Sequence, residues 1–297
     1  MDVSIIIVNY NTKQLTCQCI DSIYEKTNGV SFEIIVVDNN STDGSQELLS
    51  HDNRIVFVEA GENLGFGKAN NLGVEKSKGK YIFFLNSDTI LVNNAIKDLY
   101  DYSIHHKQLK LGAVGCLLEN PNGAKVHSYG FFPSKVSLLT NSIKAGLRLI
   151  FHKARQPVGY SVDGKEQIVD YVTGADVFVE RTVIDNYGGF DPDFFMYYED
   201  TEMQYRWWSH GLVNMIITSP RIIHLEGCST NDNKKILNER KLYMCMRSQQ
   251  LYFKKTETSF GYYIYRILSF ISLLPILRGK YNLHQIINIC KILFCRN

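Results

Sequence analysis

Three short polar clusters in the sequence carry side chains suited to holding a charged ligand, and each directly follows an apolar run. They are Asn9-Tyr10-Asn11, Asp38-Asn39-Asn40 and Asn86-Ser87-Asp88. A hard divalent cation takes oxygen ligands and often joins one or two carboxylates to substrate phosphates. Asp88 follows the apolar run 81–85 and could supply such a carboxylate. The residue types therefore favour a metal or phosphate site at this point of the chain.

Two acidic motifs each have a structural and a chemical interpretation. Asp is a favoured N-cap residue, so Asp88 could simply cap a helix that begins near Asn93. Acids in a first helical turn, such as Glu199-Asp200, stabilise a helix by about 0.3–1 kcal/mol, and Glu202 can pair with Arg206 at i,i+4. A positioned carboxylate can also accept the proton of a hydroxyl nucleophile. The residue types alone leave both interpretations open.

The segments that must position these clusters alternate between strand-like and helix-like patterns. Continuous apolar runs indicate strands that are covered on both faces. Strand, helix and strand at this spacing predict parallel pairing through right-handed crossovers. Ligands bind such sheets outside the carboxyl ends of the strands, so we expect one crevice to collect the three clusters. The predicted strands are Val3–Val8, Phe32–Val37, Arg54–Glu59 and Tyr81–Leu85, with helices from Thr12 to about Lys26 and from Gly65 to about Ser77.

The second half of the chain is less regular. Its predicted strands are Leu111–Leu118, Lys125–Tyr129, Tyr171–Val179 and Val213–Thr218, with a helix over Glu199–Ser209 that ends at Gly211. The stretch from Phe131 to about Gln167 has a mixed pattern, which is typical of an inserted segment, either mobile or facing an acceptor.

Composition excludes several classes of protein. With 297 residues, 45% apolar and 21% charged, the chain can bury a large core. A net charge of +2 gives no electrostatic basis for nucleic-acid binding. The seven cysteines include no Cys-x-x-Cys pair and predict neither a zinc site nor a disulfide framework. The N-terminus lacks the pattern of a signal peptide, so we expect reduced thiols in the cytoplasm.

The last forty residues differ in charge from the rest. Residues 258–297 contain five Lys or Arg residues and no Asp or Glu. A basic and apolar segment is typical of a membrane surface. Phe260–Leu277 is interrupted by Arg266 and Pro275 and is shorter than the roughly 20 apolar residues that a membrane span needs. We expect a helical tail lying at the cytoplasmic face of the membrane; the alternative is a pair of helices packed onto the catalytic domain.

Five segments, in order, resemble the family 2 glycosyltransferases of the GT-A fold, especially bacterial rhamnosyltransferase-like members that build surface polysaccharides. The likeness covers roughly residues 3 to 228, and the ordered set is more specific than any single segment. The segments are Ser-Ile-Ile-Ile-Val-Asn-Tyr-Asn at 4–11, Val-Val-Asp-Asn-Asn-Ser-Thr-Asp-Gly at 36–44, Asn-Leu-Gly-Phe-Gly-Lys-Ala-Asn-Asn at 63–71, Phe-Leu-Asn-Ser-Asp at 84–88, and Gly-Gly-Phe-Asp at 188–191 running into Tyr-Glu-Asp at 198–200.

The resemblance implies a role for each matching residue. Tyr10 would lie against the nucleobase, and Asp38 would accept a hydrogen bond from its imide N–H. Asp88 and His224 would bind a divalent metal, Mn²⁺ or Mg²⁺, and imidazole is the better match to Mn²⁺. Asn86 stands where many relatives have the first Asp of Asp-x-Asp, so it is expected to contact the donor. Asp200 would be the general base, with Glu199 as the other candidate. The remaining donor-pocket residues would be Asn11, Asn40, Asn63, Gly65 and Asn70.

These inferences combine into one prediction of fold and function. We expect an α/β fold of GT-A type with a Rossmann-like, mostly parallel sheet over residues 1–230, divided into a nucleotide-binding half (1–110) and an acceptor half (111–230), and a helical region over 231–297. The resemblance implies inverting, metal-dependent transfer of a sugar from a UDP- or dTDP-sugar to a saccharide or lipid-linked acceptor.

Two rival functions remain at this stage. One is a catalytically silent nucleotide-sugar-binding or membrane assembly protein. The other is a sugar-phosphate nucleotidyltransferase, which would usually carry a Gly-rich, basic loop after the first strand, where this chain has Asn9–Thr12. A dinucleotide-dependent oxidoreductase is disfavoured because Gly-x-Gly-x-x-Gly is absent there.

Overall fold

The computed structural model describes residues 1–134, 166–225, 234–277 and 283–294. These residues fall into two compact units. The first contains residues up to 131 together with 166–225, and the second contains helices α8 (Lys234–Thr256), α9 (Ser259–Leu277) and α10 (Leu283–Phe294). Most of the mixed stretch from Phe131 to about Gln167 lies outside the described residues.

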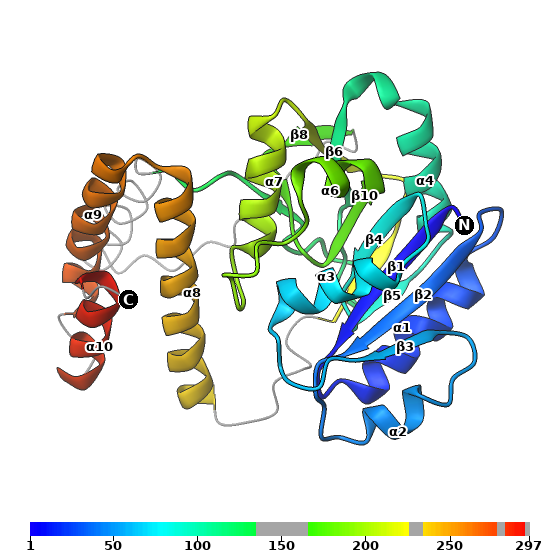
Figure 1. The fold of residues 1–297 in the computed structure, drawn as a ribbon, viewed down its shortest axis with the longest axis horizontal. Helices are drawn as coiled ribbons and strands as arrows, with labels where there is room; N and C mark the ends of the chain where they lie inside the picture. Colours follow the sequence, from blue (N-terminus) through cyan, green and yellow to red (C-terminus); the bar gives the residue numbers. More distant parts are fainter. Residues whose placement is uncertain (135–165, 226–233, 278–282, 295–297) are drawn as a thin grey trace. The chain divides into compact units, whose positions relative to one another are not determined.

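The first unit is built on an eight-stranded sheet in the order β3-β2-β1-β4-β10-β6-β11-β8 (Figure 1). Strands β3, β2, β1 and β4 are mutually parallel, and β6 is parallel to β11. Strand β10 is antiparallel to both β4 and β6, so those two run in the same direction. The predicted α/β fold with a mostly parallel sheet is confirmed. The strands are β1 (Val3–Asn9), β2 (Phe32–Asp38), β3 (Val56–Glu59), β4 (Tyr81–Leu85), β6 (Leu111–Cys116), β8 (Gln167–Val169), β10 (Asp176–Glu180) and β11 (Val213–Ile217).

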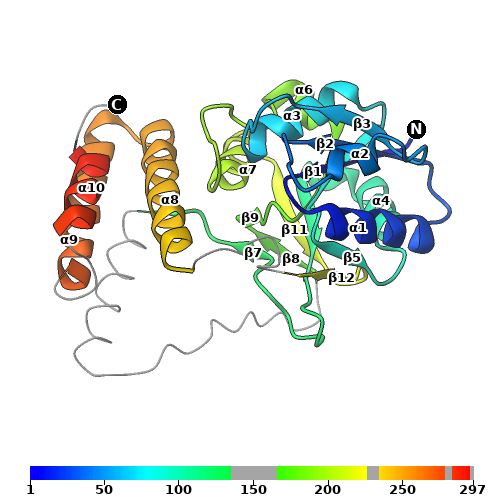
Figure 2. The ribbon, with the colours of Figure 1, turned by 90° about the horizontal axis from the view of Figure 1, so that it is seen from below.

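Helices cover both faces of this sheet (Figures 1 and 2). Alternate residues of β1 enter different cores: Ile5 and Ile7 pack with residues of α1 and α4, and Ile6 packs with residues of α6 and α7. Each fully buried side chain of this size contributes about 1.5–3 kcal/mol, which explains why these strands read as continuous apolar runs. The helices are α1 (Lys13–Lys26), α2 (Ser45–Leu49), α3 (Phe66–Lys76), α4 (Ala95–His105), α6 (Arg181–Tyr187) and α7 (Glu199–Ser209), with a 3₁₀ turn η1 at Lys107–Leu109.

Two short ladders complete the first unit. Strands β5 (Thr89–Leu91) and β12 (Ile222–His224) form one, and β7 (Tyr129–Gly130) and β9 (Tyr171–Val172) form the other. The strand predicted over Lys125–Tyr129 is wrong for most of its length, because Lys125 makes only an isolated bridge to Glu119. The strand predicted over Tyr171–Val179 is two strands, β9 and β10, separated by residues 173–175.

The second unit packs three helices through aromatic side chains. The rings of Phe253 on α8 and Tyr265 on α9 stack with centroids 4.1 Å apart, and both residues are fully buried. Ile289 and Leu293 of α10 are also buried. Among the described residues, no helix is long and apolar enough to span a membrane.

Candidate active site

The first two polar clusters meet where β1 and β2 end. Asn9 is paired with Asp38 in the ladder, and its Nδ2 donates to Asp38 Oδ1 (2.6 Å). The other carboxylate oxygen accepts from the Ser41 N–H (3.0 Å) and from Gln46 Nε2 (2.9 Å). A carboxylate offers about four acceptor positions, and three are used here by the fully buried Asp38. Asp38 therefore fixes the turn after β2, whatever it contributes to nucleobase binding.

The third cluster is joined to the first by hydroxyl groups. Thr12 Oγ1 donates to Asn9 Oδ1 (2.9 Å) and lies 3.0 Å from Ser87 Oγ. The expected convergence of these two clusters is thus present in the structure. Tyr10 remains 47% exposed, so its side chain is accessible to a ligand. Asn11 and Asn40 both adopt left-handed backbone conformations, with φ of 55° and 66°.

The second cluster contacts the glycine-rich turn before α3. Asn39 Nδ2 donates to Asn63 Oδ1 (3.1 Å), and Asn39 Oδ1 accepts from the Leu64 N–H (2.8 Å). Gly65 has φ of +81°, and a Cβ at this position would lie 2.2 Å from the Phe195 carbonyl oxygen. The close approach that requires this glycine is therefore made by the chain before α7. Asn70, also predicted for the donor pocket, is buried and donates to the Phe66 carbonyl of its own helix (3.0 Å).

Asp88 and His224 are brought together by the small β5–β12 ladder. His224 is paired with Thr89, and the Leu225 N–H donates to the Asp88 carbonyl (2.9 Å). As a result His224 Nε2 lies 3.2 Å from Asp88 Oδ1, and both side chains are nearly buried. The interpretation of Asp88 as a helix cap is wrong, because β5 intervenes and Asn94 precedes the first residue of α4.

The chemistry of this pair fits a divalent metal ion. A carboxylate oxygen and an imidazole nitrogen are both common ligands of such ions. Within the described part of the chain there is no cluster of three or more His, Cys, Asp or Glu residues that could hold a metal. Divalent ions that bind phosphorylated substrates often take only one or two protein ligands and complete their shell with phosphate oxygens. Asp88 and His224 fit a site of that kind.

Glu199 and Asp200 open α7 and have different surroundings. Asp200 Oδ2 accepts from the Gly174 N–H (2.8 Å), and its Oδ1 accepts from the Thr201 N–H (2.7 Å). Burial raises the pKa of Asp200, and these hydrogen bonds oppose that rise. Burial, and then the neighbouring Asp200 charge, raises the pKa of Glu199 to about 8. Among the described residues nothing donates to Glu199 Oε2. Asp200 is therefore the carboxyl group of the two whose charged form is stabilised by hydrogen bonds to both oxygens.

One turn holds both the acidic pair and the third polar cluster. The Gly174 N–H donates to Asp200, and the adjacent Ala175 carbonyl accepts from the Asn86 N–H (3.0 Å). Consecutive Cα atoms are about 3.8 Å apart, so a single turn positions two motifs that are far apart in the sequence. The predicted ion pair between Glu202 and Arg206 is also present, at 3.1 Å, and helps to fix α7.

The structure adds a buried acid that the sequence reasoning missed. Asp176 follows this turn, is fully buried and accepts from the Cys116 N–H through Oδ2 (2.7 Å). Burial raises its pKa to about 7, and the nearby His224 opposes the rise. The sequence signal that could have indicated Asp176 is its position as a single acid directly before the apolar residues Val177–Val179. Gly174 and Gln46 were missed as well, because nothing in their local pattern reveals their partners.

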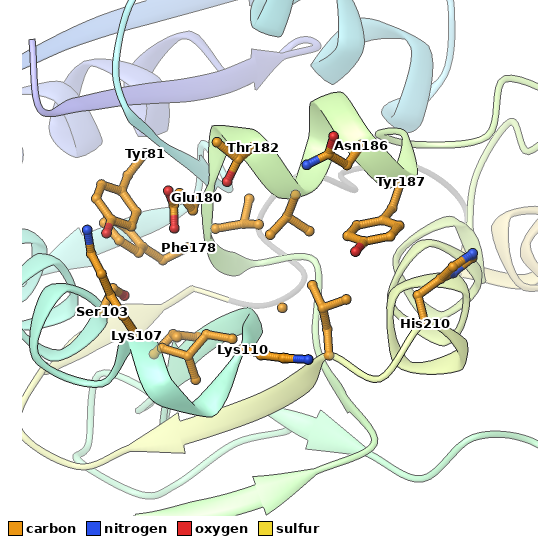
Figure 3. Close-up of a pocket in the computed structure, with 16 residues that line it drawn as sticks. Tyr81, Ser103, Lys107, Lys110, Phe178, Glu180, Thr182, Asn186, Tyr187 and His210 are labelled. Atoms are coloured by element: carbon orange, nitrogen blue, oxygen red, sulfur yellow. The ribbon is translucent and has the colours of Figure 1, made fainter.

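A pocket of about 300 Å³ lies elsewhere in the first unit (Figure 3). Its lining includes Tyr81 and Leu111, the first residues of β4 and β6, and Leu212, which precedes β11. These positions are at the amino ends of parallel strands, whereas the polar clusters follow the carboxyl ends. The pocket is therefore separate from the candidate active site.

Comparison with known proteins agrees with this geometry. Residues 4–134 match the profile of Glycosyl transferase family 2. Over this range the chain is similar to the family 2 glycosyltransferases. The matched range contains all three polar clusters and the glycine-rich turn.

Two of the proteins to which the chain is similar have named activities. The low-salt glycan biosynthesis hexosyltransferase Agl10 of Haloferax volcanii is 29% identical over 212 residues, which is 69% of this chain and 61% of that protein. The N-acetylglucosaminyl-diphospho-decaprenol L-rhamnosyltransferase of Mycobacterium tuberculosis is 25% identical over 66% of this chain and 67% of its own length. This chain thus spans less than two thirds of the Haloferax protein.

A solved structure shares the fold. Residues 1–349 of S. aureus TarS, crystallised in complex with UDP, match 99% of this chain and 80% of that chain with a TM-score of 0.56 and 15% identity. This match confirms the predicted GT-A type of α/β architecture.

Proposed function

We propose that this chain is an inverting, metal-dependent glycosyltransferase that moves a sugar from a UDP- or dTDP-sugar to a saccharide or lipid-linked acceptor during cell-surface polysaccharide synthesis. The observation that carries the proposal is the turn at Gly174-Ala175, which holds Asp200 on one side and Asn86 on the other. Through Asn86 this turn is linked to Asp88, which lies beside His224. The candidate base and the candidate diphosphate-binding pair are thereby linked through one turn.

Asp200 is suited to activate the acceptor. Its carboxylate takes the proton of the acceptor hydroxyl while that oxygen attacks the anomeric carbon. The bond from this carbon to the diphosphate oxygen breaks, the nucleoside diphosphate leaves with the electron pair, and attack from the opposite face inverts the configuration. Glu199 keeps its proton at neutral pH, since its pKa is raised to about 8. A divalent cation held by Asp88 and His224, when bound, would stabilise the charge of the leaving diphosphate.

The proposed nucleotide preference rests on two residues near the ends of β1 and β2. One is the exposed Tyr10, and the other is Asp38, whose carboxylate accepts hydrogen bonds. The ring of Tyr10 and the carboxylate of Asp38 suit a pyrimidine with an imide N–H. The UDP named for the TarS structure supports a pyrimidine nucleotide.

A thermal-shift panel tests donor binding without an acceptor. UDP-, dTDP- and GDP-sugars would be added with and without Mn²⁺, because a ligand at 100 times its Kd stabilises the folded state by about 2.7 kcal/mol. We expect a pyrimidine nucleotide-sugar with Mn²⁺ to raise Tm by several degrees. Lack of stabilisation by every donor would contradict the proposal. Stabilisation without hydrolysis or transfer would favour the silent binding protein instead.

We also propose that the second unit binds the cytoplasmic face of a membrane. Helix α9 exposes Phe260, Tyr263, Ile267 and Ile271, which recur at helical spacing and are between 39% and 73% exposed. The segment from Thr258 onward lacks acids. Apolar contact and attraction to anionic headgroups act together in interfacial helices.

Co-sedimentation with lipid vesicles tests this attachment. We expect the protein to bind phosphatidylglycerol vesicles more strongly than phosphatidylcholine vesicles, and the double variant Phe260→Ser/Ile271→Ser to bind several-fold less. Leu48→Ser is the matched control, because Leu48 is 50% exposed on α2 of the first unit. Unchanged binding after truncation at Thr256 would show that the tail is not the attachment site.

A further inference from the structure

The chain that leads into Glu199-Asp200 is hydrogen-bonded to the side chain of Asn71 on α3. Asn71 Oδ1 accepts from the Phe190 N–H (3.0 Å), and its Nδ2 donates to the Phe190 carbonyl (2.7 Å). The side-chain amide of Asn71 thus binds both the backbone N–H and the backbone carbonyl of Phe190. A Cβ on Gly189 would lie 2.7 Å from Asn71 Oδ1, so the backbone approaches this side chain closely. We refer to residues 188–198 as the approach segment.

Other contacts fix the approach segment at both ends. Arg206 and Trp207 of α7 donate to its first carbonyl, that of Gly188 (3.1 and 3.0 Å). Near its other end the Phe195 carbonyl accepts from the Phe66 N–H (3.0 Å), the first residue of α3. Helix α3 therefore contacts the segment at more than one place. Asn71 supplies the side-chain hydrogen bonds, and the ring of Phe66 packs edge-on against the ring of Phe190, with centroids 5.7 Å apart.

The end of the approach segment is strained. Tyr197 and Tyr198 are consecutive residues with φ of 70° and 67°. Bulky side chains rarely adopt this left-handed conformation, and it persists only where surrounding contacts enforce it. Glu199 and Asp200 follow directly, so the direction of these carboxyl groups depends on a backbone that would relax if it were released.

We infer that Asn71 is a positioning residue, which holds the approach segment on α3 and so keeps Glu199 and Asp200 in the arrangement needed for proton transfer. This inference rests on the proposed transferase function. Asn71 lies in the donor-binding half, so it also makes acceptor activation depend on a helix that begins at the predicted donor-binding turn, Asn63–Gly65.

Asn94 provides a matched control for Asn71. It holds another residue by the same two hydrogen bonds, since its Oδ1 accepts from the Asn28 N–H (3.3 Å) and its Nδ2 donates to the Asn28 carbonyl (3.0 Å). That contact joins the start of α4 to the loop before β2. Asn71→Ala and Asn94→Ala thus remove the same chemistry, but only the first lies next to the approach segment.

The test combines kinetics with a titration of the carboxyl groups in the full-length protein. Hydrolysis of UDP-glucose and dTDP-rhamnose, with water as acceptor, gives kcat and KM. Carbon-13 NMR of labelled Glu and Asp side chains follows Glu199 and Asp200 without any ligand. For Asn71→Ala we expect kcat to fall by up to about 100-fold at nearly constant donor KM. The Glu199 titration should move from about 8 toward its ordinary value of 4.5. Asn94→Ala should lose similar thermal stability and change neither quantity.

The outcomes separate this inference from the proposed function. Wild-type kcat and an unmoved Glu199 titration in Asn71→Ala would overturn the positioning role. Retained turnover in Asp200→Asn would instead overturn the proposed function, independently of Asn71. If Asn71→Ala does not fold, Asn71→Ser, whose shorter hydroxyl keeps one polar group near Phe190, should give an intermediate kcat and an intermediate titration. A fully wild-type Asn71→Ser would count against the inference.

Discussion

Replacing Asp200 by Asn should lower kcat for sugar transfer by about 10²- to 10⁴-fold, the usual contribution of a general base. The amide has nearly the same shape, but it cannot accept the proton of the acceptor hydroxyl. Nucleotide binding should be unchanged, because Asp200 contacts Gly174 and Thr201 and lies outside the matched donor segments. Release of nucleoside diphosphate and isothermal titration with UDP or dTDP measure the two effects separately.

Glu199→Gln is the matched control for this substitution. Because the pKa of Glu199 is raised to about 8, its side chain is protonated at neutral pH, and Gln imitates that form. The variant should keep most of its turnover at neutral pH. Near-normal transfer by Asp200→Asn, together with a large loss in Glu199→Gln, would reverse the two roles.

The same pKa also predicts how stability varies with pH. The folded protein retains the Glu199 proton up to about pH 8, whereas the unfolded chain loses it near 4.5. The folded state thus binds more protons in this window, so this group makes the free energy of unfolding fall as pH rises through it. Glu199→Gln removes the effect and should be more stable than wild type at the upper end of the window. Denaturant unfolding at several pH values checks the sign.

Sequence patterns predicted the central strands well because these strands are buried on both faces. Tyr81–Leu85 was predicted with its observed bounds, since five apolar residues in a row suit a strand with helices on both sides. The pattern failed at 171–179, where a strand-like run that contains Thr173, Gly174 and Asp176 is split into two strands. The Gly174 N–H leaves the ladder there to bond Asp200, and no local pattern contains a partner 26 residues away.

The candidate site shows the same limit. The resemblance identified Asp88 and His224, and the structure places them 3.2 Å apart through the register of a short ladder. The resemblance assigned no role to Asn71, the last residue of the matching segment 63–71, because its contact with Phe190 joins residues 119 positions apart in the chain. Motifs indicate which residues contact a ligand, but the side chains that hold those residues in place depend on the tertiary packing.

Removing the Asp88 carboxylate should abolish the dependence on divalent metal. In Asp88→Ala we expect Mn²⁺ to add nothing to the thermal stabilisation by UDP or dTDP, and kcat to fall to a level that no longer responds to metal. The physical reason is that, in the part of the chain that the structure describes, the candidate site offers two protein ligands, so loss of Asp88 leaves the imidazole of His224. His224→Ala should weaken the metal response less, because the carboxylate carries the charge that attracts the cation.

Asp98→Ala serves as the control for this experiment, since Asp98 is an acid in the first turn of α4 and belongs to none of the three polar clusters. It should keep the full Mn²⁺ response. Thermal shifts of each variant without ligand correct for the lost contact between Asp88 and His224 in the free protein. A Mn²⁺-dependent rise in Tm that survives in both Asp88→Ala and His224→Ala would place the metal elsewhere. Because the Asn86–Ala175 hydrogen bond is a backbone contact, it survives these substitutions, and any loss can be assigned to the metal ligands themselves.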